Sequence, residues 1–175
     1  AIAVSLRSGL DQPFAGDVID PYGGRGDLEQ RVLKALSPDV FANDPSRLLR
    51  GPRLAAFLRF DLDPGTAKMI ARDAHLVASV APERVREELL KILAEPGVAS
   101  SLGLLDSLGL LTLILPELEE SRGVSQPKEH HWDVFNHSVQ AAVQAERIVQ
   151  VRPDNGPVLS AVPWSDEVAA HFAGE

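Results

Sequence analysis

The sequence has 175 residues, with 17 Lys and Arg against 25 Asp and Glu, a formal net charge of -8 and no cysteine. Without cysteine the chain has no disulfide, no thiolate metal site and no cysteine nucleophile. Apolar residues make up 45% of the sequence, but no apolar run approaches the roughly 20 residues that cross a bilayer. We therefore expect a cytoplasmic globular protein that does not enter a membrane.

The first half of the chain is predicted to be helical after a short extended start. Residues 14–19 favour a weak strand. Apolar side chains then recur at helical intervals over residues 28–36, 48–58 and 85–93. A proline at the first helical position marks three helix starts, at Asp44-Pro45, Asp63-Pro64 and Pro82.

The second half continues the helical pattern. Leucines over residues 102–110 predict a helix that Gly109 and Pro116 end, and another helix is expected over residues 133–149. A proline-rich loop at residues 152–163 and a short helix at 166–172 complete the chain. The sequence therefore predicts an all-α fold, an irregular bundle of six or seven short helices. The expected buried face of residues 133–149 comprises Val134, Ala141, Ala142, Ala145, Ile148 and Val149.

Basic side chains gather in one predicted helix. Residues 45–60 hold Arg47, Arg50, Arg53 and Arg59 and no acidic residue, although the chain as a whole is acidic. A basic helix on an acidic body indicates a local surface that faces phosphate. The alternative is a solvated helix face without a ligand.

Asp44 and Arg47 stand three residues apart at a helix start, so their side chains can point the same way. A carboxylate acceptor beside a guanidinium donor matches the Watson-Crick edge of cytosine or adenine, which offers an amine and a ring nitrogen. Uracil and guanine present a carbonyl and an N–H there, which reverses both partners. The alternative interpretation is an N-cap carboxylate and a surface cation.

Six short motifs follow one another along the chain. They are Asp20-Pro-Tyr-Gly-Gly24, Asp27-Leu28, residues 41–50, residues 82–89, residues 108–118 and residues 131–137. In this order and spacing, roughly residues 1–150 resemble the neck and body of bacterial tRNA nucleotidyltransferases and poly(A) polymerases, the family that includes CCA-adding enzymes. The resemblance does not extend to that family's catalytic head.

The resemblance implies roles for particular residues. Asp44 and Arg47 match the protein template that selects CTP or ATP in that family. Arg50 and Arg53 are expected near the triphosphate or the RNA backbone, because their helix carries no acidic residue. Supporting residues are Asp20, Gly23, Gly24 and Asp27, which resemble the hinge before the neck, and Glu83, Arg84 and Arg86, which fall in the motif that supports the template helix.

Two positions depart from the family pattern. Asn43 stands where the family normally has Glu, and Gly51-Pro52 stands where the neck helix normally continues with Ala-Ile. A proline inside a helix removes a backbone hydrogen bond and costs roughly 3 kcal/mol unless the helix bends. The effect of these two changes on the choice of nucleotide is left open.

Catalysis in this family uses Mg²⁺ held by a Gly-Ser motif and an Asp-x-Asp in the head. Asp61-Leu-Asp63 has the right spacing but lacks the Gly-Ser and precedes Pro64. We therefore interpret it as a turn and an N-cap. No catalytic residue is assigned, and the fragment alone is predicted to be inactive, while its parent protein would use Mg²⁺ with ATP or CTP as substrates.

Histidines near residue 133 raise the question of a metal site. His130, His131 and His137 surround Asp133, and the run up to His137 resembles the opening of an HD-type phosphohydrolase domain. That fold also needs a His-Asp dipeptide, which this sequence lacks. We therefore expect no metal site here and keep His137 only as a weak candidate.

The sequence divides into three expected segments: residues 1–26 end the head and form the hinge, residues 27–122 form the neck and body, and residues 123–175 begin an HD-like region. The predicted function is a fragment of an RNA 3′-end nucleotidyltransferase that contributes CTP or ATP selection and binds RNA, with the tRNA 3′ end as the expected partner. The alternative is a non-catalytic helical RNA-binding or interaction module derived from that family. The bases added, the RNA extended and the oligomeric state are left open.

Overall fold

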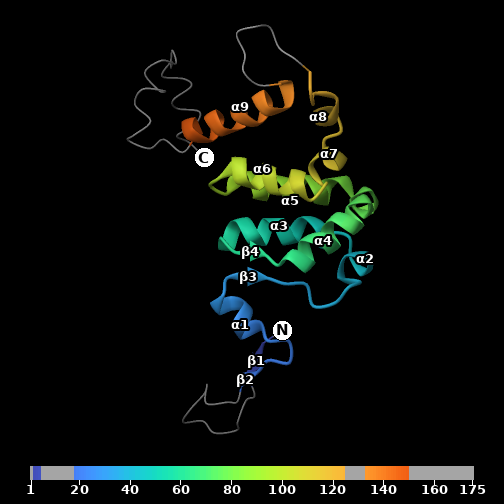
Figure 1. Ribbon diagram of the computed structural model, residues 1–175, viewed down its shortest axis with the longest axis vertical. Coiled ribbons are helices and arrows are strands. Elements are labelled where there is room, and N and C mark those ends of the chain that lie inside the picture. The colour runs from blue at the N-terminus through green and yellow to red at the C-terminus, as the bar shows by residue number, and fades with distance from the viewer. Residues whose placement is uncertain (1, 5–17, 125–132, 150–175) are drawn as a thin grey trace.

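The structure is a computed structural model that describes residues 2–4, 18–124 and 133–149 (Figure 1). These residues form nine α-helices, one 3-10 helix and four two-residue strands. The all-α prediction is confirmed, and the helix number exceeds six or seven because three of the helices are turns of four residues. The α-helices are α1 (Gly24–Glu29), α2 (Val40–Asn43), α3 (Arg47–Leu58), α4 (Pro64–Asp73), α5 (Pro82–Ala94), α6 (Val98–Ser107), α7 (Leu111–Ile114), α8 (Glu117–Glu120) and α9 (Val134–Val149). The 3-10 helix is η1 (Ala74–Ser79), and the strands are β1 (Ala3–Val4), β2 (Val18–Ile19), β3 (Val32–Leu33) and β4 (Asp61–Leu62).

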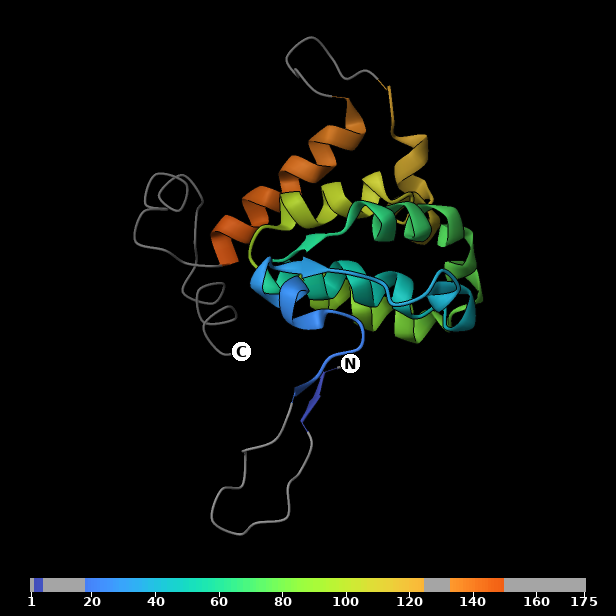
Figure 2. The same cartoon turned by 60° about the horizontal axis from the view of Figure 1, so that its bottom comes forward.

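The elements follow one another along the long axis of the molecule. The antiparallel pair β1 and β2 lies beside α1 at one end, α3 to α6 form the middle, and α9 lies at the other end (Figures 1 and 2). One apolar core joins α2, α3, α4, α5, α6, α7, η1 and α9. Burying each large side chain of this core contributes about 1.5–3 kcal/mol. The fully buried ones are Leu48, Leu49, Ile70, Ile92, Leu105, Leu110 and Leu111.

Helix α3 is the centre of this arrangement, because it packs on both α5 and α6. Leu48, Leu49 and Ala55 form its buried face, as their spacing predicts. The helix continues through Pro52, whose ring is buried in the same face. The start of α3 shares a cavity with the start of α5, and its end shares another with the residues after α5, so the two helices run in parallel.

The helical stripe predicted over residues 28–36 is wrong. Helix α1 ends at Glu29, and Arg31 then takes a left-handed φ of 55° that turns the chain. Val32 and Leu33 leave as strand β3 and pair in parallel with β4. Asp61 is therefore part of a strand and not of the predicted turn. The apolar pair could not distinguish these outcomes, because two successive apolar residues fit a short strand as well as a helix.

Helix α9 confirms the helix predicted over residues 133–149, and its buried face agrees with the predicted one only in part. The side chains of Ile148 and Val149 lie outside the described residues. Phe135 is buried, and Val139, Ala142 and Val143 pack against the core, whereas Ala141 and Ala145 are exposed. Arg122 holds this helix in place, because its guanidinium lies 3.9 Å from the centre of the Phe135 ring and pairs with Asp106 and Glu119. The prediction relied on the spacing of the small alanines. The helix instead turns the larger Phe135 ring toward the core, because the ring buries more apolar surface.

Three predictions fall partly or wholly outside the described residues. They are the loop at 152–163, the helix at 166–172 and the strand at 14–19, of which only Val18 and Ile19 are described, as β2. In the part of the chain that the structure describes, no helix combines the length and apolarity that a membrane crossing requires.

Candidate functional site

The chain enters α3 through a tight turn at Asp44. Helix α2 ends at Asn43, and Asp44 is extended, with φ −150° and ψ 91°. Its Oδ1 accepts from the amide of Ser46 at 3.2 Å and from the Ser46 hydroxyl at 2.6 Å. The predicted helix start at Asp44-Pro45 is wrong, because α3 begins at Arg47 and its N-cap, Ser46, makes no side-chain capping bond. The Asp44 carboxylate instead closes the turn that precedes the helix.

The second carboxylate oxygen of Asp44 faces Arg47. Oδ2 lies 3.3 Å from Arg47 Nε, and the two side chains are 35% and 45% exposed. Arg47 also donates from Nη1 to the Val40 carbonyl at 3.4 Å, which ties the guanidinium back to α2. The structure therefore brings the predicted pair together at the surface, with an acceptor and a donor fork side by side.

The surroundings of Asp44 keep it ionised. The Ser46 hydroxyl lowers the pKa of Asp44 most, partial burial opposes this, and the Ser46 amide and the charges of Arg47 and Arg50 lower the pKa further. A carboxylate with a depressed pKa remains an acceptor-only group across the physiological pH range. This is the protonation state that accepting a hydrogen from a base amine requires.

A small cavity lies beside this pair. It has a volume of about 180 Å³ and is bordered by Arg47 and Arg50 of α3, by Lys34 after β3, and by the apolar side chains of Phe41 and Leu54. An apolar floor with cations at the rim suits a flat base with an anionic tail. Arg50 is thus placed at the same opening as Arg47.

Arg53 points to a different partner. Its Nε donates to Glu88 Oε2 of α5 at 2.6 Å, and the two side chains are 24% and 10% exposed. Lys91 Nζ lies 3.5 Å from the other carboxylate oxygen of Glu88. This network fixes α3 on α5, and the nucleotide-binding role of Arg53 stays a prediction.

The three supporting residues predicted on α5 are exposed, and only Arg84 lies near the pair. Arg84 borders a cavity of about 250 Å³ together with Asp44, Pro45 and Ser46. Glu83 and Arg86 are exposed on the first turns of the same helix. Within the described residues, Glu88 is the α5 carboxylate that contacts α3.

Ser46 and Glu88 were not predicted from the sequence, although the position of each in the sequence indicates a structural role. Glu88 falls within the apolar stripe of α5, between Val85 and Ile92, where a carboxylate needs a buried partner. Ser46 follows Asp44 by two residues, and such a spacing is typical of a side-chain-closed turn. Neither signal names the partner, because Arg53 and Glu88 are 35 positions apart.

The predicted hinge residues form a tight turn before α1. Asp20 accepts from the amides of Gly24 at 2.8 Å and Arg25 at 2.9 Å. The Arg25 amide is the larger cause that lowers the pKa of Asp20. Gly23 has a φ of 70°, which favours glycine, and Asp27 stands in the first turn of α1. These residues therefore form a hydrogen-bonded turn that leads into α1.

The acidic and histidine candidates for metal binding are engaged elsewhere or exposed. Asp63 caps α4, where it accepts from the Thr66 amide at 2.9 Å, as predicted. Asp133 accepts from the Asn136 amide at 2.8 Å and the Gly123 amide at 3.0 Å. His137 is exposed on α9. Over residues 18–124 and 133–149, no group of three potential ligands gathers around one point, and His130 and His131 lie outside the described residues.

Known proteins similar to this chain include RNA-binding and tRNA-processing proteins. A family model described as the probable RNA and SrmB-binding site of polymerase A matches residues 59–121. The A-adding tRNA nucleotidyltransferase of Deinococcus radiodurans is 40% identical over 157 residues, which cover 87% of this chain and 34% of the relative. These matches support a segment of a tRNA nucleotidyltransferase. The chain spans about a third of the length of such curated relatives.

Other relatives and solved structures agree with this similarity. The multifunctional CCA protein of Thioalkalivibrio sulfidiphilus is 38% identical over 141 residues, covering 77% of this chain and 34% of that relative. The crystal structure of the Bacillus stearothermophilus CCA-adding enzyme with CTP has a TM-score of 0.57 at 25% identity, covering 90% of this chain and 46% of that one. A tRNA nucleotidyltransferase solved with a primer tRNA and an ATP analog shares the fold, with a TM-score of 0.63 at 24% identity and coverage of 93% and 42%.

Proposed function

We propose that this chain selects CTP or ATP and binds RNA for an enzyme that extends the 3′ end of tRNA. The observation that carries the proposal is the geometry at the start of α3. Ser46 holds one oxygen of Asp44, and the other oxygen is left beside the guanidinium of Arg47. An ionised acceptor next to a donor complements the amine and ring nitrogen of cytosine or adenine.

Arg50 and Lys34 border the cavity next to this pair and supply positive charge for a triphosphate. Arg84 of α5 borders a separate cavity with Asp44 and adds positive charge there. We assign Arg53 a positioning role through Glu88, because that ion pair fixes the helix that carries Asp44 and Arg47. In this scheme one helix bears the base-selecting groups, and α5 keeps it in place.

The division of labour along the chain follows the same proposal. Residues 1–26 would link to the catalytic head, residues 27–122 would form the neck and body, and residues 123–175 would begin an HD-like region. Asp61 lies in β4 and Asp63 caps α4, so neither supports a role as a Mg²⁺ ligand. We therefore propose that the catalytic carboxylates and their Mg²⁺ belong to the head and that this chain alone does not transfer nucleotides.

Nucleotide addition by the intact protein tests the proposal. We expect CTP or ATP to be added to a tRNA transcript in preference to UTP and GTP, and Asp44→Ala to remove that preference. Addition of nucleotides by residues 1–175 alone would contradict the assignment of catalysis to the head. Equal binding of all four nucleotides, unaffected by Asp44→Ala, would instead favour a non-catalytic RNA-binding module.

A further inference from the structure

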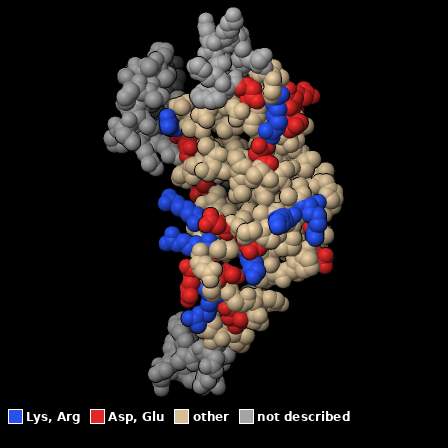
Figure 3. Space-filling model, in the orientation of Figure 1, with Lys and Arg blue, Asp and Glu red and all other residues tan. Residues whose placement is uncertain are grey.

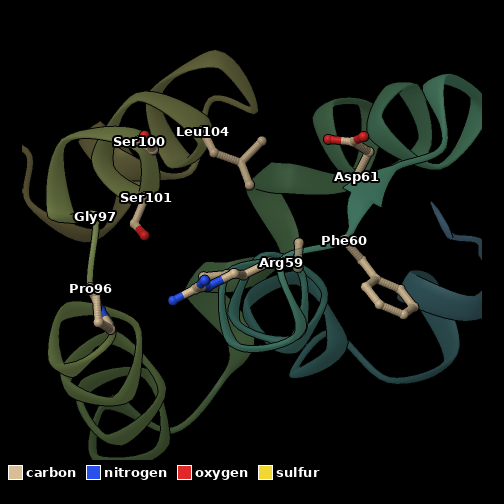
Figure 4. A pocket seen from close by; sticks show the side chains of 10 residues that line it. Arg59, Phe60, Asp61, Pro96, Gly97, Ser100, Ser101 and Leu104 are labelled. Carbon is tan, nitrogen blue, oxygen red and sulfur yellow. The ribbon is translucent and has the colours of Figure 1, made fainter. Parts of the chain in front are cut away.

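A third cavity lies at the opposite end of α3 from Asp44. It has a volume of about 470 Å³ and opens between the end of α3 and the start of α6 (Figure 4). Arg59 reaches into it toward Pro96 and Gly97, and the Ser101 hydroxyl points to the same side (Figure 4). Asp61 also borders the cavity, but its carboxylate is directed away from Arg59 (Figure 4).

Arg59 holds a backbone conformation that does not suit it. With φ 54° and ψ 47°, it ends α3 in the left-handed region, where glycine is the usual residue. An L side chain is strained there. The Arg59 guanidinium is exposed and makes no hydrogen bond or ion pair with the described residues. The left-handed backbone of Arg59 is therefore strained, and no contact of its side chain within the described residues offsets that strain.

Ser101 is a second polar residue at this cavity whose side chain lacks a partner. The residue is 6% exposed, and its hydroxyl has no hydrogen-bond partner among the residues that the structure describes. The side chain is nine-tenths buried, and its hydroxyl remains available to a ligand that enters the cavity. Strain and unsatisfied polar groups concentrate at functional sites, because a ligand supplies what the fold lacks.

The backbone beside the cavity already holds an anion. The amides of Gly97 and Val98, at the start of α6, donate to the two Glu146 oxygens of α9 at 2.6 and 3.2 Å. This helix start therefore favours negative charge, and those two amides are occupied. Basic side chains also project from the edge of the molecule where α3 ends (Figure 3). The groups left to a ligand are the Arg59 fork and the Ser101 hydroxyl.

We propose that Arg59 and Ser101 form a binding site for a phosphate of an RNA backbone. Arginine binds phosphate through two parallel N–H donors, and a serine hydroxyl adds a third. Both residues lie within residues 59–121, the segment that matches the RNA-binding family model. The inference rests on the RNA binding in the proposed function and adds the residues that perform it, at the end of α3 away from the base-selecting pair.

Two substitutions separate the ligand role from the cost to the fold. Arg59→Gly removes the guanidinium and relieves the left-handed strain, and Ser101→Ala removes the unsatisfied hydroxyl. We expect Arg59→Gly in the intact protein to melt about 3 °C higher than wild type and Ser101→Ala to melt within about 1 °C of it. We expect Arg59→Gly to lower the affinity for a tRNA transcript about tenfold and to reduce the salt slope by about one. Ser101→Ala should lower the affinity about threefold at unchanged charge.

The chain offers a matched control in Arg31, which has the same left-handed conformation, with a φ of 55°, and does not border the cavity. Arg31→Gly should melt higher in the same way and lose less tRNA affinity than Arg59→Gly. Equal losses from Arg31→Gly and Arg59→Gly, or unchanged affinity in Ser101→Ala, would overturn the site while leaving the proposed function in place. Absence of tRNA binding by wild type would instead contradict the proposed function.

Competition identifies the source of the phosphate. We expect an excess of a tRNA transcript to protect Arg59 from modification by an arginine reagent, and equal concentrations of ATP or inorganic phosphate to leave it accessible. Protection by ATP and not by the transcript would overturn the assignment to RNA and point to a free nucleotide.

Discussion

The polar side chains at the two ends of α3 differ in whether they have partners within the fold. At the start, Asp44 bonds to Ser46 and pairs with Arg47, so each group already has a partner within the fold. At the end, Arg59 and Ser101 face one cavity without partners among the described residues. A fully connected cluster has one fixed geometry, which suits discrimination between bases. Unpartnered donors suit an anion that every RNA sequence carries.

Between the two ends, Arg53 and Glu88 hold α3 against α5. This ion pair is more buried than the Asp44–Arg47 pair, with side chains 24% and 10% exposed against 35% and 45%. A less exposed pair contributes more to the placement of a helix, because water screens it less. The middle of the helix therefore has a structural task, and each end is available for a ligand.

The largest expected effect is the loss of this central pair. Arg53→Met leaves the Glu88 carboxylate buried without its closest partner, and we expect the free energy of unfolding to fall by about 3 kcal/mol. Arg50→Met, an exposed position on the same helix, should stay within about 0.5 kcal/mol of wild type. Chemical denaturation measures both, and a smaller loss for Arg53→Met than for Arg50→Met would contradict the structural role.

The next effect concerns base selection at the start of α3. Asp44→Asn keeps the shape of the side chain but replaces an acceptor with an amide donor, so we expect the preference of the intact protein for CTP or ATP over UTP and GTP to fall by about thirtyfold, or about 2 kcal/mol. Relative rates of nucleotide addition measure this preference. Asp39→Asn is the control, because Asp39 is exposed and its side chain makes no capping bond. A preference that survives in Asp44→Asn would place base selection elsewhere.

The sequence predicted much of the fold because the helix signals are local. Pro64 and Pro82 start α4 and α5 where expected, and Asp63 caps its helix. Strands β3 and β4 escaped prediction, because their pairing joins residues that lie almost thirty positions apart and each strand has only two residues. No periodicity can be detected over two residues.

The candidate site divides in the same way. Asp44 and Arg47 were predictable, because both lie in one turn and their spacing decides their contact. The Arg53–Glu88 pair was not, because it depends on how α5 packs against α3. Ser101 was likewise hidden, since an unsatisfied hydroxyl is recognised only when all of its neighbours are known.

A smaller effect concerns the Asp-Pro start of α4. Asp63 accepts from both the amide and the hydroxyl of Thr66, so Asp63→Ala should cost about 1 kcal/mol of stability at neutral pH. The Thr66 amide is the main cause that lowers the pKa of Asp63. The stabilisation is therefore present above the unfolded pKa of about 3.9 and is lost as the pH falls through the lower folded value.

Denaturation of the Asp63→Ala variant between pH 7 and pH 2 tests this effect, with Asp61→Ala as control, because Asp61 is exposed and caps no helix. The difference between Asp63→Ala and wild type should shrink toward the acid end. A difference that stays constant with pH would show that the cap does not depend on the charge of Asp63.

The smallest effect isolates Ser46. Its hydroxyl is the main cause that lowers the pKa of Asp44, so Ser46→Ala should raise that pKa. Selection of CTP or ATP needs the ionised carboxylate and is lost as the pH falls through the pKa of Asp44. In Ser46→Ala this loss should begin at a higher pH, with a preference about threefold weaker than wild type near the acid limit of activity. Ser46→Thr keeps the hydroxyl and should restore the wild-type profile. An unchanged pH profile of base preference in Ser46→Ala would mean that the charges of Arg47 and Arg50 suffice to keep Asp44 ionised. The ionisation of Asp44 would then depend on these two arginines and not on Ser46.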